Sequence, residues 1–169
     1  MSRGEGGGSG GGGRRSRPQE VAPVATPGDT LDTRYLESLI GYNARRAALT
    51  AIGLFLERMA VYGLKPVEFS VLSLIAHNPG ATSRQLCTAL AILPPNLVGL
   101  IAALDRRGFI ERRAHPSDGR AWGLHLSPAG AALMHNAEAT ASEVEQAVTA
   151  RLSTAERGTL IGLLQKVYR

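Results

Sequence analysis

Hydrophobic residues recur at helical spacing through most of the chain from residue 31 onward. Between 31 and 62 the intervals are three, four or seven residues, which predicts one long helix that stops at Gly63. A second helix is predicted from Pro66 to about His77, before a turn signal at 78–80. The first helix has more apolar surface than a small domain needs for its own core, so we expect a second copy of the chain to cover it.

Two shorter helices are predicted next, and the second has an unusual outer face. Thr82 and Gln85 stand where a capping box begins a helix, which we expect to turn Leu86 and Leu90 inward. The following helix is predicted over 94–107, with apolar residues at i, i+3, i+4 and i+7 facing the core. Its opposite face carries short or small side chains and one arginine: Pro95, Asn96, Gly99, Ala102, Ala103 and Arg106. Such a smooth face suits close approach to the floor of a DNA groove, or to another protein surface.

The hydrophobic period then changes from helical to two. Strands are predicted at 109–113 and 121–126, joined by a turn that contains Pro, Asp and Gly. In the second strand, Trp122, Leu124 and Leu126 alternate as in a half-buried strand. Two helices joined by a tight turn and followed by a basic hairpin are the layout of a winged helix-turn-helix.

Two further helices are predicted after the hairpin. Ser127 is a cap residue before a Pro, and the helix that it begins is predicted to reach about Leu152. A capping box at 153–156 begins the last helix, which carries an apolar stripe of Leu160, Leu163, Leu164 and Val167. We therefore expect a mostly α fold, in which the helices of 29–63 and 128–169 form a dimerisation region and residues 64–127 form the winged helix-turn-helix with its two-stranded β-hairpin wing.

The first 28 residues differ in composition from the rest. They are rich in Gly, Arg and Pro and almost free of large apolar side chains, so they are predicted to be a disordered tail. The remaining 29–169 are long enough to bury one core. No apolar run approaches the length that spans a bilayer, and no signal peptide is evident, so we expect a soluble cytoplasmic protein with no membrane partner.

Charge and cysteine content narrow the choice of partner. The net charge is +5 and the basic residues are nearly all Arg, with Lys only at 65 and 166. Arginine suits phosphate and guanine because its planar fork donates paired hydrogen bonds, although a base-composition bias of the genome produces the same skew. The single cysteine, Cys87, excludes an intramolecular disulfide. We interpret it as a small core residue, with redox sensing as the alternative.

The stretch from Leu90 to Gly130 resembles the MarR family of winged helix-turn-helix transcriptional regulators. The match is gapless through 108–113 (Gly-Phe-Ile-Glu-Arg-Arg), 118–121 (Asp-Gly-Arg-Ala) and 126–130 (Leu-Ser-Pro-Ala-Gly). A looser resemblance runs from about residue 40 to the C-terminus. It implies a sequence-specific DNA-binding regulator, a dimeric repressor that a small ligand releases from a pseudo-palindromic operator.

The resemblance also implies which residues contact DNA. The expected set is Thr82, Ser83, Arg84, Pro94, Pro95, Asn96, Val98, Gly99, Arg112, Arg113, Ser117, Asp118 and Arg120. The helix of 94–107 would enter the major groove, where Asn96 is the one side chain able to pair bidentately with adenine. Arg120 would reach the minor groove with Asp118 orienting it, and residues 82–84 would hold phosphate. The two Arg of the first strand are interpreted as backbone contacts or wing ion pairs.

Members of the family bind small aromatic acids or related metabolites, and some bind the coenzyme A thioester of an aromatic acid. The resemblance therefore implies a pocket between the first, second and fifth helices. Tyr42, Arg45, Arg46 and Tyr62 are the expected ligand contacts. The alternative for the two Arg is that they make interhelix salt bridges.

Enzymatic activity is not expected. The sequence has no nucleophile elbow, phosphate-binding Gly loop or helical metal pair, and we predict no cofactor. His115, Asp118 and His125 lack the spacing of a metal site. Two functional alternatives remain at this point: a winged-helix protein-interaction module without DNA binding, and a redox-sensing regulator that acts through Cys87.

Overall fold

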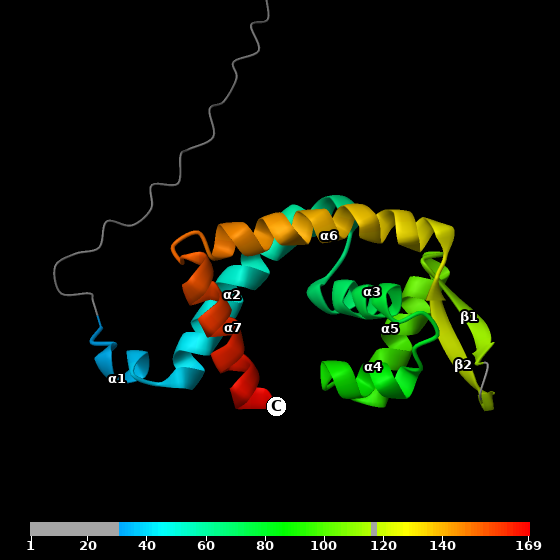
Figure 1. The fold of residues 1–169 in the computed structure, drawn as a ribbon, viewed down its shortest axis with the longest axis horizontal. Helices are drawn as coiled ribbons and strands as arrows, with labels where there is room; N and C mark the ends of the chain where they lie inside the picture. The colour runs from blue at the N-terminus through cyan, green and yellow to red at the C-terminus, as the bar shows by residue number, and fades with distance from the viewer. Residues whose placement is uncertain (1–30, 116–117) are drawn as a thin grey trace, which may run out of the picture.

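The computed structural model describes residues 31–115 and 118–169; for 115 and 118–121 it gives the backbone. Figure 1 shows a helical molecule with one small antiparallel sheet at one end. The elements in chain order are α1 (Arg34–Glu37), α2 (Ile40–Met59), the short 3₁₀ helix η1 (Ala60–Tyr62), α3 (Pro66–His77), α4 (Ser83–Leu90), α5 (Pro94–Arg106), β1 (Ile110–His115), β2 (Asp118–Leu126), α6 (Pro128–Val148) and α7 (Thr154–Tyr168). The mostly α winged helix-turn-helix fold is confirmed. The predicted tail lies outside the described residues.

The single long helix predicted over 31–62 is wrong in one respect: the chain leaves the helical conformation between α1 and α2. Local side-chain bonds explain the break. The hydroxyl of Ser38 donates to the carbonyl of Tyr35 at 2.7 Å, and the amide of Asn43 donates to the carbonyls of Glu37 and Leu39 at 2.7 and 2.8 Å. Such bonds replace the backbone bonds that would continue the helix.

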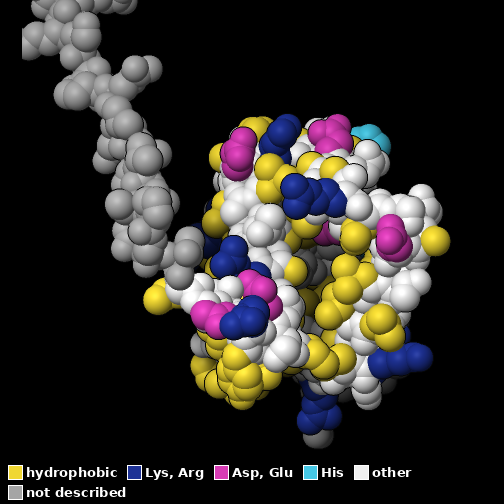
Figure 2. Space-filling model, turned by 90° about the vertical axis from the view of Figure 1, so that its left-hand side faces the viewer, with side chains coloured by type: hydrophobic (Ala, Val, Ile, Leu, Met, Phe, Trp, Pro, Cys, Tyr) yellow, Lys and Arg dark blue, Asp and Glu magenta, His cyan; other side chains and the backbone are white. Residues whose placement is uncertain are grey.

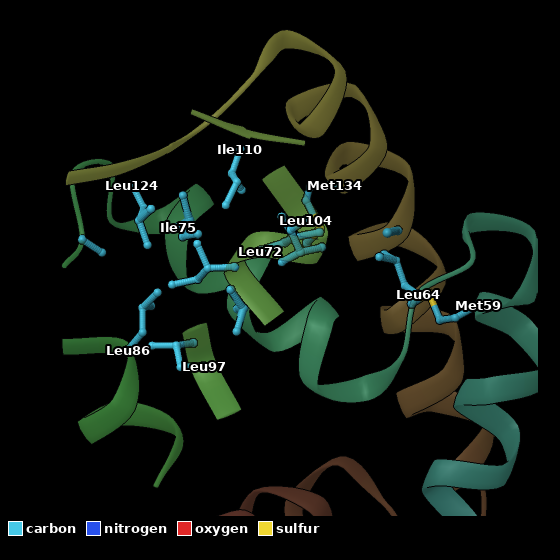
Figure 3. Packing of buried hydrophobic residues seen from close by; sticks show 14 residues of the cluster. Met59, Leu64, Leu72, Ile75, Leu86, Leu97, Leu104, Ile110, Leu124 and Met134 are labelled. Atoms are coloured by element: carbon cyan, nitrogen blue, oxygen red, sulfur yellow. The ribbon is translucent and has the colours of Figure 1, made fainter. Parts of the chain in front are cut away.

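The hydrophobic core lies where α3, α4, α5, the hairpin and α6 meet (Figure 3). Leu72, Ile75, Leu86, Leu97 and Leu104 are almost wholly buried there. Of the four positions of α5 that the periodicity predicts to face the core, Leu97, Ile101 and Leu104 are buried and Leu100 is only partly buried. No single helix in the described parts of the chain is long and apolar enough to cross a membrane, although two bent helix pairs meet that test by length and composition alone.

The turn between α4 and α5 contains one residue with a strained backbone conformation, Ala91. The capping box of Thr82 and Gln85 at the start of α4 is confirmed. At the other end, Ala91 has φ 51° and ψ 40°, the left-handed region that costs an L-residue about 1–2 kcal/mol. The N–H groups of Ala91 and Ile92 bond to the carbonyls of Thr88 and Cys87, and these bonds keep the turn tight.

The wing is a longer hairpin than predicted, and it is joined to the helix-turn-helix by backbone bonds. The N–H of Gly80 donates to the carbonyl of Leu124 at 2.8 Å, and the N–H of Leu124 donates to the carbonyl of Ala81 at 2.9 Å. Leu124 is buried, but Trp122 is 61% exposed, so the prediction that Trp122 belongs to the buried face of this strand is wrong. The hydrophobic core includes Leu124 but does not extend along the strand to Trp122, which lies nearer the tip of the wing.

The long helix α6 crosses the whole molecule above α2 and α3 (Figure 1). Its start at the Ser127 cap is confirmed, because the Ser127 hydroxyl accepts from the N–H of Gly130. Gly130 permits a close approach: a Cβ there would lie 2.0 Å from the carbonyl oxygen of Phe109. The helix ends at Val148, four residues before the predicted Leu152, where the Thr149 hydroxyl donates to the carbonyl of Glu145.

The capping box that begins α7 is also confirmed. The hydroxyl of Ser153 donates to the carboxylate of Glu156 at 2.7 Å and its backbone N–H donates at 2.8 Å. The side-chain bond and then the backbone bond hold the pKa of Glu156 below its usual value. The cap therefore fixes the start of a helix that has no buried residue of its own.

Candidate nucleic-acid interface and ligand pocket

The N-terminal half of α5 presents its outer face to solvent. Two prolines begin this helix. Backbone N–H groups in the first turn of a helix have no acceptor within the helix, so proline, which has no N–H, loses no hydrogen bond there. All five of the residues predicted to read bases are exposed on it: Pro94, Pro95, Asn96, Val98 and Gly99. Val98 is 64% exposed, a large fraction for an aliphatic side chain. Asn96 is exposed, and its side-chain amide forms no hydrogen bond with the described residues, so its donor and acceptor are both available.

The three phosphate contacts predicted at the start of α4 differ in their surroundings: one residue forms the helix cap and two are exposed. The hydroxyl of Thr82 donates to Gln85 Oε1 at 2.9 Å and accepts from the Gln85 N–H, so it serves the cap. Ser83 and Arg84 are exposed on the first turn of α4, where the helix dipole favours an anion. Among the described residues, Arg84 forms no ion pair, so its charge is available.

The arginines of β1 form ion pairs at the base of the wing. Arg112 Nε lies 3.5 Å from Asp105, and Arg113 Nη2 lies 3.0 Å from Glu111. Wing ion pairs were one of the two interpretations of these residues, and the structure contains them. Exposed pairs of this kind contribute little stability, so both cations can exchange their partner for a phosphate.

The wing tip is only partly described. Ser117 lies outside the described residues. Asp118 and Arg120 belong to the backbone of β2, which places them at the tip end of the hairpin. Their predicted pairing and minor-groove contact remain expectations.

Arg107, which the sequence analysis did not single out, ties the end of α5 to the start of α3. Its guanidinium donates to the carbonyls of Tyr62 and Gly63 at 3.3 and 3.0 Å and lies 3.5 Å from the Glu68 carboxylate. The same group lies 4.8 Å from the ring centroid of Phe109. Glu68 is buried and also accepts from the N–H of Lys65 at 2.8 Å. Only one feature of the sequence indicated this cluster, which is the position of Glu68 in the first turn of a helix that begins with proline.

A broad apolar surface covers the end of the molecule opposite the wing. Figure 2 shows hydrophobic side chains gathered on this face. The helices α1 and α7 bury no residue, and α2 buries only Met59. The exposed apolar side chains of these helices are Tyr35, Leu36, Ile40, Leu49, Ile52, Leu56, Leu160, Ile161, Leu163, Leu164, Val167 and Tyr168. A single chain that leaves so much apolar surface uncovered has an interaction surface there.

The four predicted ligand residues do not form one site within the chain. Arg46 lies beside Tyr42, with its guanidinium 6.0 Å from the ring centroid and Nη1 3.4 Å from the hydroxyl. Tyr62 ends η1, just beyond the far end of α2 and roughly 30 Å away along the helix axis, and its hydroxyl bonds to Thr140 Oγ1 at 2.9 Å. In the described structure neither Arg45 nor Arg46 forms a salt bridge, so the interhelix alternative for them is not observed either.

A pocket of about 400 Å³ lies instead between α2, α3 and α6. Phe55 and Phe69 pack edge to face in it, with ring centroids 5.5 Å apart. Beside them, Glu138 Oε1 accepts from the Ser73 hydroxyl at 3.1 Å and bonds to His77 Nε2 at 3.0 Å. The lining is completed by Ala141, Ser142, Val144 and Glu145. The sequence analysis expected a pocket between these three helices but named none of the residues that line it, because they come from three separate helices.

Cys87 lies partly buried against the core. Over the ranges that the structure describes, no group of three His, Cys, Asp or Glu residues lies close enough to hold a metal ion.

A short helix pair with an exposed second helix, followed by a wing bonded to it, defines a winged helix-turn-helix protein of the DNA-binding type. The model of the MarR family matches residues 62–121. A putative transcriptional regulatory protein for the hcr operon of Thauera aromatica is 34% identical over 131 residues, which are 77% of this chain and 79% of the relative. The chain belongs to the MarR family, and the relatives that it matches are transcriptional regulators and repressors.

Two solved structures of one repressor are similar to this chain. The transcriptional repressor CouR bound to a 23-mer DNA duplex is 35% identical, with a TM-score of 0.77, and the match covers 83% of this chain and 99% of that one. CouR bound to p-coumaroyl-CoA is 33% identical, with a TM-score of 0.73, and the match covers 83% of this chain and 97% of that one.

Proposed function

We propose that this protein is a dimeric repressor that binds a pseudo-palindromic operator and is released from it by a small aromatic ligand. The observation that carries this proposal is the outer face of α5, which is exposed and free of charge over its N-terminal half and lies beside a wing. A solubilising surface would carry charged side chains. A face that must lie against the floor of the major groove has reason to be small and neutral.

Few side chains on this surface are able to form hydrogen bonds with DNA bases. Of the residues on the N-terminal half of α5, only Asn96 has a side chain that forms hydrogen bonds, and its amide suits adenine. Val98 and the two prolines suit contact with thymine methyl groups. Arg120 enters the minor groove from the wing with Asp118 beside it, and Ser83 and Arg84 hold phosphate. DNA shape then supplies a larger share of specificity than hydrogen bonding does.

The partner for the exposed apolar surface is a second copy of the chain. The helices that carry the surface, α1, α2 and α7, bury almost nothing within one chain and would be poorly stabilised alone. Association through them leaves the two α5 helices free to enter successive major grooves. This arrangement accounts for the expected symmetry of the operator.

The ligand occupies the pocket between α2, α3 and α6. Two phenylalanine rings provide an apolar surface for an aromatic group, and the volume suits a ring with a short acyl arm. The comparison with CouR supports an aromatic acid in the form of its coenzyme A thioester. The ligand releases DNA only if it binds more tightly to a dimer whose recognition helices have the wrong spacing.

A gel shift with the DNA upstream of the protein's own gene, repeated over a salt series, tests the proposal. We expect a specific complex whose affinity falls steeply with salt concentration, because binding displaces counterions from phosphates. Addition of p-coumaroyl-CoA or another aromatic acyl thioester should release the DNA. A folded dimer that gives no specific shift at low salt would contradict the proposal and favour a protein-interaction module.

A further inference from the structure

The first turn of α5 has no backbone donor left for a DNA base. Its first two residues are prolines and carry no N–H. The next two N–H groups, those of Asn96 and Leu97, both donate to the carbonyl of Leu93, at 3.0 and 3.2 Å. Most helices leave N–H groups at this end that can donate to an acceptor on a ligand. The start of α5 therefore offers a base edge side chains rather than backbone.

Two aliphatic side chains project from this end of the helix. Leu93 is 69% exposed and Val98 is 64% exposed, whereas Leu97 between them is buried. Of residues 93–99, only Asn96 has a side chain that forms hydrogen bonds. In the major groove, an aliphatic side chain recognises a base by contact with a methyl group. Leu93 and Val98 are therefore suited to detect a methyl group and not a donor or an acceptor.

Gly99 lies beside Val98 and one helical turn after Pro95, on the exposed face of α5. A Cβ placed on Gly99 would meet no described atom within 4 Å, so the fold of the chain does not require a glycine there. Glycine inside a helix costs stability relative to alanine. Its benefit arises where another molecule approaches the helix backbone closely. Gly99 thus lets the floor of a groove come nearer to α5.

The 5-methyl group belongs to two pyrimidines. Thymine carries it beside the O4 acceptor, and 5-methylcytosine carries it beside the N4 amino donor. A protein distinguishes these two bases only if it places a donor or an acceptor at that position. Leu93 and Val98 provide neither, so a base that they contact is read as methylated or unmethylated, and not as thymine or cytosine.

We propose that α5 reads the 5-methyl group of pyrimidines through Leu93 and Val98, so that 5-methylcytosine replaces thymine at the contacted positions and binding weakens where the methyl group is absent. The inference rests on the proposed function, which places α5 in the major groove. It adds cytosine methylation of the operator as a regulatory input to binding. Leu93 and Val98 are the specificity-determining residues, and Gly99 is a positioning residue.

Fluorescence anisotropy of the full-length protein with modified versions of the DNA upstream of its own gene tests this. Each T·A pair of the operator is replaced in turn, in both half-sites, by U·A, C·G or 5-methylcytosine·G. At the contacted positions U·A should weaken binding by at least about tenfold, since one buried methyl group contributes about fourfold and each half-site provides one. At the same positions, 5-methylcytosine·G should bind more tightly than C·G by a similar factor.

Two variants separate contact with the methyl group from any change in DNA shape. Val98→Ala and Leu93→Ala should each lower the ratio of T·A to U·A affinity by at least about threefold at one or more of these positions. An effect of uracil on DNA stiffness would persist in both variants. Val61→Ala is the matched control, because Val61 is 79% exposed but lies on η1, and it should leave every ratio unchanged.

The positioning role of Gly99 has its own readout. Gly99→Ala should raise the temperature of thermal unfolding, because alanine is the better helix former and its Cβ meets no described atom. The same variant should weaken binding to the unmodified operator by at least about tenfold, because the added methyl group holds the helix away from the bases. A glycine needed only for folding would instead lower the unfolding temperature when replaced.

Four results would overturn the inference: equal affinity for the T·A and U·A operators at every position, no gain of 5-methylcytosine over cytosine, unchanged ratios in both aliphatic variants, or full operator affinity of Gly99→Ala. Any of these, observed together with a specific complex on the unmodified operator, rejects this inference and leaves the proposed function standing. The absence of a specific complex with every version of the DNA rejects both.

Discussion

The guanidinium of Arg107 lies 3.5 Å from the buried carboxylate of Glu68, so the end of the recognition helix α5 is joined to the first turn of α3. The same α3 helix provides a wall of the pocket through Phe69 and Ser73. One rigid element therefore contacts both the pocket and the anchor of α5. In the proposed mechanism, a shift of α3 on ligand binding would reach α5 through this pair.

Replacing Arg107 by Met should destabilise the protein by about 1–3 kcal/mol, because Glu68 loses its cation and two carbonyls lose a donor. Denaturant unfolding followed by circular dichroism measures the change. The neighbouring Arg106 is exposed and forms no ion pair within the described residues, so Arg106→Met is the control and should change stability by less than about 0.5 kcal/mol. Equal effects of the two substitutions would contradict the role given to Arg107.

Ala91→Gly should stabilise the protein by about 0.5–1 kcal/mol. The left-handed backbone at Ala91 is strained for alanine and not for glycine, and the relief exceeds the extra chain entropy of glycine. The control is Ala89→Gly, on the exposed side of α4, which should destabilise by up to about 1 kcal/mol. Opposite signs in thermal unfolding are the expected result, and a loss of stability at both positions would show that the strain is not relieved.

Asn96→Ala should lower affinity for the operator by about 1–3 kcal/mol while affinity for unrelated DNA stays unchanged, because base contacts specify and phosphate contacts do not. Arg84→Ala should weaken binding to both DNAs and reduce the salt slope by about 1. Fluorescence anisotropy on both duplexes over a salt series distinguishes the two patterns. Unchanged operator affinity of Asn96→Ala would remove the only hydrogen-bonding base contact proposed on α5.

Leu163→Glu should convert the proposed dimer to a folded monomer, because Leu163 lies in the exposed apolar stripe of α7 and a charge there cannot be buried. Sedimentation velocity gives the mass, and circular dichroism checks the helix content. Gln165→Glu adds the same charge on a different side of the helix and should leave the dimer intact. A Leu163→Glu protein that remains a dimer would move the interface away from α7.

The parts of the fold that depend on neighbouring residues were predictable, and the parts that depend on distant contacts were not. The caps at Thr82 and Ser153 were correct because each needs only a partner three residues away. The exposure of Trp122 depends on where the core ends beneath the strand, which no alternation reveals. Trp122 therefore could not be placed from the strand pattern alone.

The candidate sites show the same division. The exposed face of α5 could be predicted because the periodicity of one helix defines it. The pocket could not, since Phe55, Phe69 and Glu138 come from three helices and their sequence positions do not indicate that they meet. The expected set of Tyr42, Arg45, Arg46 and Tyr62 was chosen by residue chemistry, and the length of α2 separates its members.

Trp122 is the only tryptophan of the chain, and it is exposed on β2 rather than buried in the core. Its indole is therefore already largely in water in the native state, so its emission should change little on unfolding. The same emission reports directly on the wing, where docking against a duplex would alter the surroundings of the ring. The protein thus carries its own optical probe of DNA engagement, which needs no label and is nearly blind to the stability of the core.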